Sequence, residues 1–201
     1  MRVRMKMKTT GSGRINTYQI CLVAMAVVIN IVGGQIALML RLPVYLDSIG
    51  TILTGAVLGP WFGMLPNLLS GIFMGMTVDI YSLYFAPVGM ITGIMSGIQL
   101  HGESAGKPVK GRWIFLKGLG VSVPGTVMSA VINAVLFGGV TSSGSTVIVQ
   151  LLARTPLGLT GSIFAVQFLT DYTDRCISIF AVSVILPLVS GELRRRISGG
   201  R

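Results

Sequence analysis

Residues 18–40 of the chain read YQICLVAMAVVINIVGGQIALML, an apolar run without a charged side chain. About 20 consecutive apolar residues are enough for an α-helix to cross the hydrocarbon core of a bilayer. The run is continuous, whereas an outer-membrane barrel would need alternating segments of about ten residues. This stretch therefore predicts a first transmembrane helix and an all-α integral membrane protein.

Further apolar runs follow the first one along the chain. They cover residues 47–59, 63–78, 84–100, 113–139 and 171–189. Gly59, Pro60 and Gly63 leave almost no loop between the second and third runs, which predicts a helical hairpin. The runs together predict a bundle of six transmembrane helices over residues 18–191, flanked by short segments at 1–17 and 192–201.

The last third of the sequence is less regular. Residues 138–145 are rich in Gly, Ser and Thr and predict a loop. Residues 146–170 are moderately apolar and are interrupted by Arg154 and Pro156, so they fit a lid, a surface helix or part of the sixth span. The sixth span is expected to begin at a charged turn that contains Asp171, Asp174 and Arg175.

The composition agrees with a membrane protein and orients it. Apolar types make up 52% of the 201 residues and charged types only 11%, whereas a soluble domain carries about 25% charged residues. With six spans, 13 of the 16 basic residues fall in residues 1–17, 101–118 and the C-terminal tail. The positive-inside rule then places both termini in the cytoplasm. Anionic lipid is a sufficient partner for this charge, so we expect no nucleic-acid binding.

The sequence lacks the motifs of nucleotide hydrolysis and of common hydrolases. Residues 102–108 come nearest to a phosphate-binding loop, but they have one residue too few between the glycines, and Pro108 replaces Ser or Thr. The single histidine, His101, lies at a predicted membrane edge. Cys21 and Cys176 fall inside apolar runs and are expected to be small buried hydrophobes. We expect no enzyme activity, no cofactor and no metal site.

Polar and aromatic side chains recur at one predicted depth, on the outer side of the membrane. Charges at a bilayer are costly and tend to pair or to line a cavity, and the aromatic and polar mixture suits a small-molecule ligand. A surface ion pair of Asp171 with Arg175 and helix capping by Asp47 are the alternatives. Both charge signs are present, so the charge of the ligand stays open. The candidate substrate-binding residues are Arg41, Tyr45, Asp47, Asp79, Tyr81, Tyr84, Asn133, Asp174 and Arg175.

Two stretches, LPVYLDSIGT at residues 42–51 and GAVLGPWFG at residues 55–63, resemble the substrate-binding S component of energy-coupling factor (ECF) transporters. The segments YFAPVG at residues 84–89 and DRCIS at residues 174–178 are similar to the same family. The resemblance extends over about residues 18–192.

The resemblance implies a subunit in the bacterial cytoplasmic membrane that captures a vitamin or related micronutrient outside the cell. Such a subunit delivers its substrate through a transmembrane T component and two ABC ATPases. The first helix of the family usually packs two alanines, four residues apart, on the T component. The corresponding residues here are Ala24 and Ala26, with Val28 at the second small position. A membrane sensor module and a small secondary transporter are the alternative functions.

Overall fold

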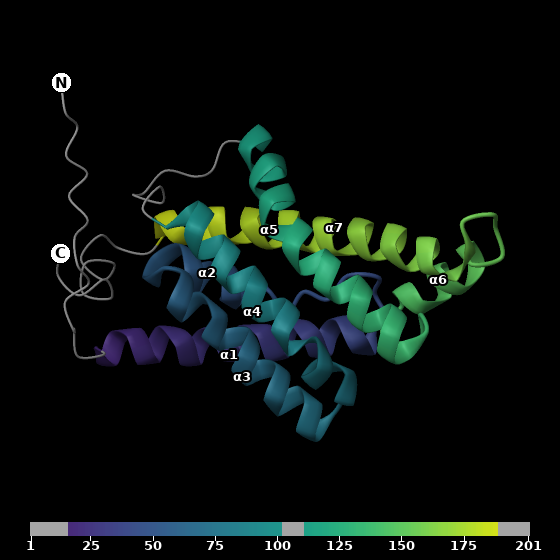
Figure 1. The fold of residues 1–201 in the computed structure, drawn as a ribbon. Coiled ribbons are helices and arrows are strands. Elements are labelled where there is room, and N and C mark those ends of the chain that lie inside the picture. The colour runs from purple at the N-terminus through teal and green to yellow at the C-terminus, as the bar shows by residue number, and fades with distance from the viewer. Residues whose placement is uncertain (1–15, 102–110, 189–201) are drawn as a thin grey trace, which may run out of the picture.

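The computed structural model describes residues 16–101 and 111–188. Within these ranges the chain is helical and contains no strand (Figure 1). The elements are α1 (Thr17–Met39), α2 (Ile49–Leu58), α3 (Pro60–Thr77), α4 (Ile80–Leu100), α5 (Gly111–Ile132), the π-helical turn η1 (Asn133–Phe137), α6 (Ser145–Leu152) and α7 (Gly158–Leu188).

The first three helices follow the sequence-based expectation closely. Asn16 and Gln19 form a capping box at the start of α1, in which the backbone amide of Asn16 donates to Gln19 Oε1 at 3.1 Å. The predicted hairpin is confirmed, since only Gly59 separates α2 from α3. Gly59 has a φ of 92°, a conformation that favours glycine, and Pro60 occupies the first turn of α3.

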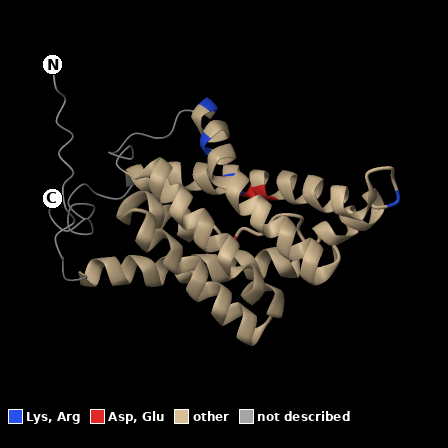
Figure 2. Ribbon diagram, in the orientation of Figure 1, with Lys and Arg blue, Asp and Glu red and all other residues tan. Residues whose placement is uncertain are grey.

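The last helix differs from the expectation. α7 spans 31 residues without interruption, so Asp171, Asp174 and Arg175 lie in its middle rather than at a charged turn (Figure 2). The prediction that the sixth span begins at these residues is therefore wrong. The region 146–170 divides into α6, a short turn and the first turns of α7.

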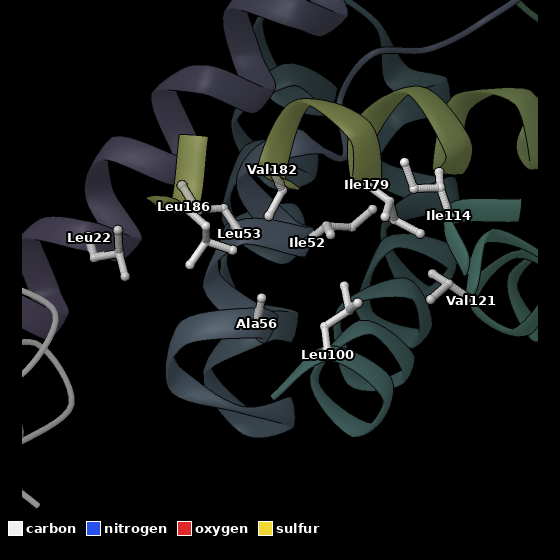
Figure 3. Packing of buried hydrophobic residues seen from close by; sticks show 10 residues of the cluster. All are labelled: Leu22, Ile52, Leu53, Ala56, Leu100, Ile114, Val121, Ile179, Val182 and Leu186. Atoms are coloured by element: carbon white, nitrogen blue, oxygen red, sulfur yellow. The ribbon is translucent and has the colours of Figure 1, made fainter. Parts of the chain in front are cut away.

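α2 is the central helix at one end of the bundle. Seven of its ten residues are buried. A cluster of buried apolar side chains surrounds it (Figure 3), and α1, α2, α4, α5 and α7 all contribute to this cluster. Its members are Leu22, Ile52, Leu53, Ala56, Leu100, Ile114, Val121, Ile179, Val182 and Leu186, which we call the apolar cluster.

Glycines bring α2, α3 and α4 into close contact. A Cβ atom on Gly93 of α4 would lie on the backbone carbonyl of Gly63 in α3, and one on Gly97 would meet Pro60. Gly55 of α2 similarly abuts Ser96 of α4. Small residues allow such approach between helices in lipid, where packing rather than hydrophobicity drives association.

Three helical segments within the described ranges are long and apolar enough to cross a membrane: Thr17–Met39, Ile80–Leu100 and Gly111–Phe137. This is compatible with a transmembrane protein. α1 and α7 run in opposite directions, so the start of α1 and the end of α7 lie on the same side of the bundle (Figure 1). Most of the basic residues on which the predicted orientation depends lie in 1–15, 102–110 and 189–201, outside the described residues.

The two cysteines do not share one environment. Cys21 is exposed on the surface of α1, so its predicted burial is wrong, whereas Cys176 of α7 is partly buried. Within the described ranges no group of three or more His, Cys, Asp or Glu residues is arranged to hold a metal ion.

Candidate functional site

A cavity lies at the end of the bundle opposite the apolar cluster. It is bounded by α1, α3 and α4, by the loop that joins α1 to α2 (residues 40–48) and by the loop that follows η1 (residues 138–144). Its volume is about 730 Å³ when counted out to the open mouth. The lining residues are Asn30, Gly34, Ala37, Leu38, Leu42, Val44, Tyr45, Asp47, Asn67, Ser70, Gly71, Met74, Asp79, Tyr81, Ser82, Phe85, Thr141, Ser142 and Ser143.

The 40–48 loop is held by the middle of α7. The Leu46 amide donates to Asp174 Oδ1 at 2.7 Å, and the Arg175 guanidinium donates both to Ser48 Oγ and to Asp174 Oδ2. Asp174 is 0% exposed and Arg175 is 5% exposed. Leu46 has a φ of 52°, in the left-handed region that costs a non-glycine residue energy. This buried ion pair therefore fixes a backbone turn that the loop would not adopt by itself.

Two asparagines tie the same loop and α2 to neighbouring helices. Asn30 of α1 donates to Thr51 Oγ1 at 2.8 Å and accepts from the Gly50 amide at 2.9 Å. Asn67 of α3 donates to the Asp47 carbonyl at 3.2 Å. Both asparagines also line the cavity. Their side chains thus connect the packing of the bundle to the wall of the site.

The second loop covers the cavity from the other side. Ser142 Oγ donates to Asp79 Oδ2 at 2.8 Å, across 63 residues of sequence, and Ser82 Oγ donates to the same oxygen at 3.3 Å. Gly138 and Gly139, at the start of this loop, have φ angles of 54° and 84°. The loop is therefore attached to the α3–α4 corner through one carboxylate.

An aromatic cluster lies beside this contact. The ring of Phe137, at the end of η1, lies 4.8 Å from Tyr81, 5.4 Å from Tyr84 and 6.0 Å from Phe85, measured between ring centroids. The first two contacts are edge-to-face, which is a favourable geometry for aromatic pairs. Tyr81 and Phe85 also line the cavity, so its wall is aromatic on the side of α4.

The groups of the 40–48 loop have altered acidities. Loss of water contact raises the pKa of Asp47, and the neighbouring Asp174 carboxylate raises that pKa further. Burial also raises the pKa of Tyr45, with a second contribution from Asp171. A carboxyl group with a raised pKa is one for which the surroundings do not fully stabilise the charge.

A buried polar seam lies between α5 and α7, next to the ion pair. Gln167 Nε2 donates to Ser129 Oγ, whereas Gln167 Oε1 and Asn133 Oδ1 have no hydrogen-bond partner among the described residues. Asp171 is buried in the same seam, at 3% exposed. Buried polar atoms without a partner are costly.

Four of the nine predicted substrate-binding residues line the cavity: Tyr45, Asp47, Asp79 and Tyr81. Asp174 and Arg175 lie behind the wall and hold the 40–48 loop instead. The other three do not line the cavity. Arg41 is exposed, Tyr84 contacts Phe137, and Asn133 is buried in η1.

Five lining residues outside the predicted set carry hydroxyls: Ser70, Ser82, Thr141, Ser142 and Ser143. None of them belongs to a distinctive motif. Ser142 lies in the predicted Gly/Ser/Thr loop, whose composition indicates a connection but not its contact with Asp79.

The two alanines predicted to contact a T component are separated by the structure. Ala24 is exposed on α1. Ala26 is 0% exposed and packs against Gly50 of α2, so it belongs to the interior of the bundle. Ala26 is therefore removed from the candidate contact surface.

Comparison with known proteins gave no significant match to a family model, to a curated protein or to a solved structure.

Proposed function

We propose that the chain is the substrate-binding S component of an ECF-type transporter in a bacterial cytoplasmic membrane. It would capture a vitamin-like small molecule outside the cell and deliver it through a T component and two ABC ATPases. The observation that carries this proposal is the cavity at one end of an apolar helical bundle, with two loops at its mouth. Binding sites for small molecules are typically concave and combine an apolar lining with a few polar groups, and the lining of this cavity has both.

The construction of the site supports binding rather than catalysis. Its lining consists of carboxylate, amide, hydroxyl and aromatic groups, and the one histidine of the chain is not among them. The sequence carries no complete phosphate-binding loop, so energy for uptake would come from separate ATPase subunits. A bundle of six spans with cytoplasmic termini is part of the same proposal.

The exposed face of α1 is the proposed contact surface for the T component. Ala24 lies on this face, and so do the apolar side chains of Ile20 and Val28. Lipid and a partner helix would compete for such a surface.

A ligand screen followed by reconstitution tests this function. The purified protein would be heated with each member of a vitamin panel, because a ligand at about 100 times its Kd adds roughly 2.7 kcal/mol to the free energy of unfolding. Vesicles would then carry the protein with or without a T component and two ATPases. We expect one tight ligand and uptake only when ATP and all subunits are present. Uptake without the ATPases would overturn the proposal and favour a secondary transporter.

A further inference from the structure

The described wall of the cavity has acidic groups and no basic ones. Asp47 and Asp79 belong to its lining, whereas none of the Lys, Arg or His residues within 16–101 and 111–188 does. The chain as a whole has 16 basic and 6 acidic residues. The cavity wall is therefore acidic, whereas the protein as a whole is basic.

Neither carboxylate of the wall forms an ion pair with a described residue. Asp79 accepts hydrogen bonds from the hydroxyls of Ser142 and Ser82, at 2.8 and 3.3 Å, and Asp47 accepts one from Ser48 at 3.1 Å. Hydroxyl donors stabilise a carboxylate without cancelling its charge. Two carboxyl groups therefore line the cavity with hydroxyls as their side-chain hydrogen-bond partners among the described residues.

The nearby guanidinium does not compensate for them. Arg175 is bound to Asp174 and to Ser48, and Asp171 lies one helical turn away on the same helix. Among the residues that the structure describes, one cation thus serves a region that holds Asp47, Asp171 and Asp174. Figure 2 shows acidic residues in the middle of α7. Basic residues are visible farther away, at the start of α5 and in the turn between α6 and α7. An ionisable group at membrane depth without a counter-charge of its own is a candidate functional group.

The remaining part of the wall suits the same kind of partner. Tyr81 and Phe85 present aromatic rings to the cavity, and Phe137 holds both rings in place. The faces of such rings attract a cation within about 6 Å of the centroid. Ala37, Leu38 and Met74 add an apolar surface on the side of α1 and α3.

We propose that the cavity binds a small organic cation, in which a protonated amine or quaternary nitrogen is attached to an aromatic or apolar body. The nitrogen would lie between the carboxylates of Asp47 and Asp79, and the body would contact the rings of α4. This inference rests on the proposed function for the location of the site and specifies the charge class of its substrate.

Three probes of matched size and different charge test the proposal: benzylammonium, benzyl alcohol and benzoate. Each would be titrated into the purified full chain at neutral pH, to about 10 mM, where even weak binding is detectable by ligand NMR. We expect benzylammonium to bind at least about tenfold more tightly than benzyl alcohol, the scale of one hydrogen bond to a charged group. We expect no detectable binding of benzoate.

Matched variants assign the preference to the two carboxylates. Asp79→Asn and Asp47→Asn should each bring benzylammonium and benzyl alcohol to within about threefold of each other, because each variant removes one charge. Asp79→Glu should retain the preference, which controls for folding. Arg154→Gln changes an exposed charge in the turn after α6 and should leave the preference unchanged.

The outcomes separate the charge class from the function. Equal binding of the three probes, tighter binding of benzoate, or no binding of benzylammonium would overturn the cationic substrate. A tight vitamin ligand that is neutral or anionic would do the same, while ATP-dependent uptake of that ligand would leave the transport function standing. If the reconstituted vesicles show no ATP-dependent uptake but the protein still prefers benzylammonium, the transport function is overturned and the cationic binding site stands.

Discussion

The two ends of the bundle are held together in different ways. At the end around α2, helices meet through the apolar cluster and through contacts between glycines and backbone. At the cavity end, loops and helices meet through single polar contacts, such as Leu46 with Asp174 and Ser142 with Asp79. Apolar packing is spread over many atoms and tolerates the loss of one contact. A buried polar contact places its whole contribution to the free energy of folding in two groups, and loss of one group leaves the other without a hydrogen-bond partner.

The difference suggests a division of tasks. The apolar end is closely packed, and closely packed atoms rearrange only at a cost in free energy. At the cavity end, charged side chains of α7 and of the α3–α4 corner hold the two loops. Substitutions at the apolar end should therefore alter the stability of the fold alone. At the cavity end, substitutions of buried residues should alter stability, and substitutions of residues that line the cavity should alter binding.

The largest effect is expected from Arg175→Met. This change leaves Asp174 as a buried carboxylate without its ion pair and releases Ser48, so the free energy of unfolding should fall by about 3–5 kcal/mol. Chemical denaturation in detergent would measure it. Arg154→Met, at an exposed position, is the control and should cost less than about 0.5 kcal/mol. Equal losses in the two variants would show that the ion pair does not stabilise the fold.

A smaller loss is expected at the opposite end from Gly93→Ala. The added methyl would press on the backbone of Gly63, and overpacking of this kind costs about 1–3 kcal/mol. Gly111→Ala is the matched control, since a Cβ atom at Gly111 meets nothing within 4 Å. The measurement is thermal unfolding of both variants. Benzylammonium binding by the folded fraction of Gly93→Ala should be unchanged, and a loss of binding would contradict the division between the two ends.

The acidity of Asp47 predicts how cation binding varies with pH. Its pKa is raised in the free site, and a bound cation favours the carboxylate, so binding of benzylammonium should tighten as pH rises and weaken as pH falls through this pKa. Each unit of difference in pKa between the free and bound site corresponds to about tenfold in affinity. The other titratable or charged groups that face Asp47 are Tyr45 on the same loop and Asp171, Asp174 and Arg175 on α7.

Titration of two variants and a second probe assigns this pH dependence. Asp47→Asn should flatten the profile, whereas Asp79→Asn should retain its shape at lower affinity. Benzyl alcohol should bind independently of pH, because it carries no charge. A profile that persists in Asp47→Asn would assign the titration to another group.

The smallest change in stability is expected from Ser142→Ala. Its hydroxyl lies on an exposed loop, so the free energy of unfolding should change by less than about 0.5 kcal/mol. Limited proteolysis within residues 138–144 should nevertheless become faster, because the attachment of the loop to Asp79 is lost. Ser82→Ala removes a hydroxyl that reaches the same oxygen from α4 and is the control. Equal cleavage of both variants would show that Ser142 does not hold the loop.

The sequence predicted the helices of the first half better than those of the second. The run at residues 18–40 and the Gly59–Pro60 break identify α1 and the α2–α3 hairpin, because length and turn residues act locally. α7 was missed as one helix because three charged residues in its middle were interpreted as a turn. Arg175 and Asp174 are compatible with a buried helix because they pair with each other and because Leu46 and Ser48 of the distant 40–48 loop complete their hydrogen bonds, which a local pattern does not show.

The candidate site was predicted in part for the same reason. Tyr45, Asp47, Asp79 and Tyr81 were found because charge and aromaticity are conspicuous in an apolar sequence. Asn30 and Asn67 are not distinctive in the sequence, since an amide serves equally well in helix packing and in a binding site. The structure shows that both roles are filled by the same side chains.

The brevity of α2 bears on how the protein is synthesised. Ten helical residues extend about 15 Å, whereas the hydrocarbon core of a bilayer is about 30 Å thick. α2 covers only about half of this thickness, so its crossing in the proposed six-span bundle depends on the segments on either side of it, and one residue separates it from α3. We expect the insertion machinery to receive α2 and α3 as one unit. α2 would then become fully packed only after α7 emerges from the ribosome, because α7 supplies Ile179, Val182 and Leu186 to the apolar cluster around it.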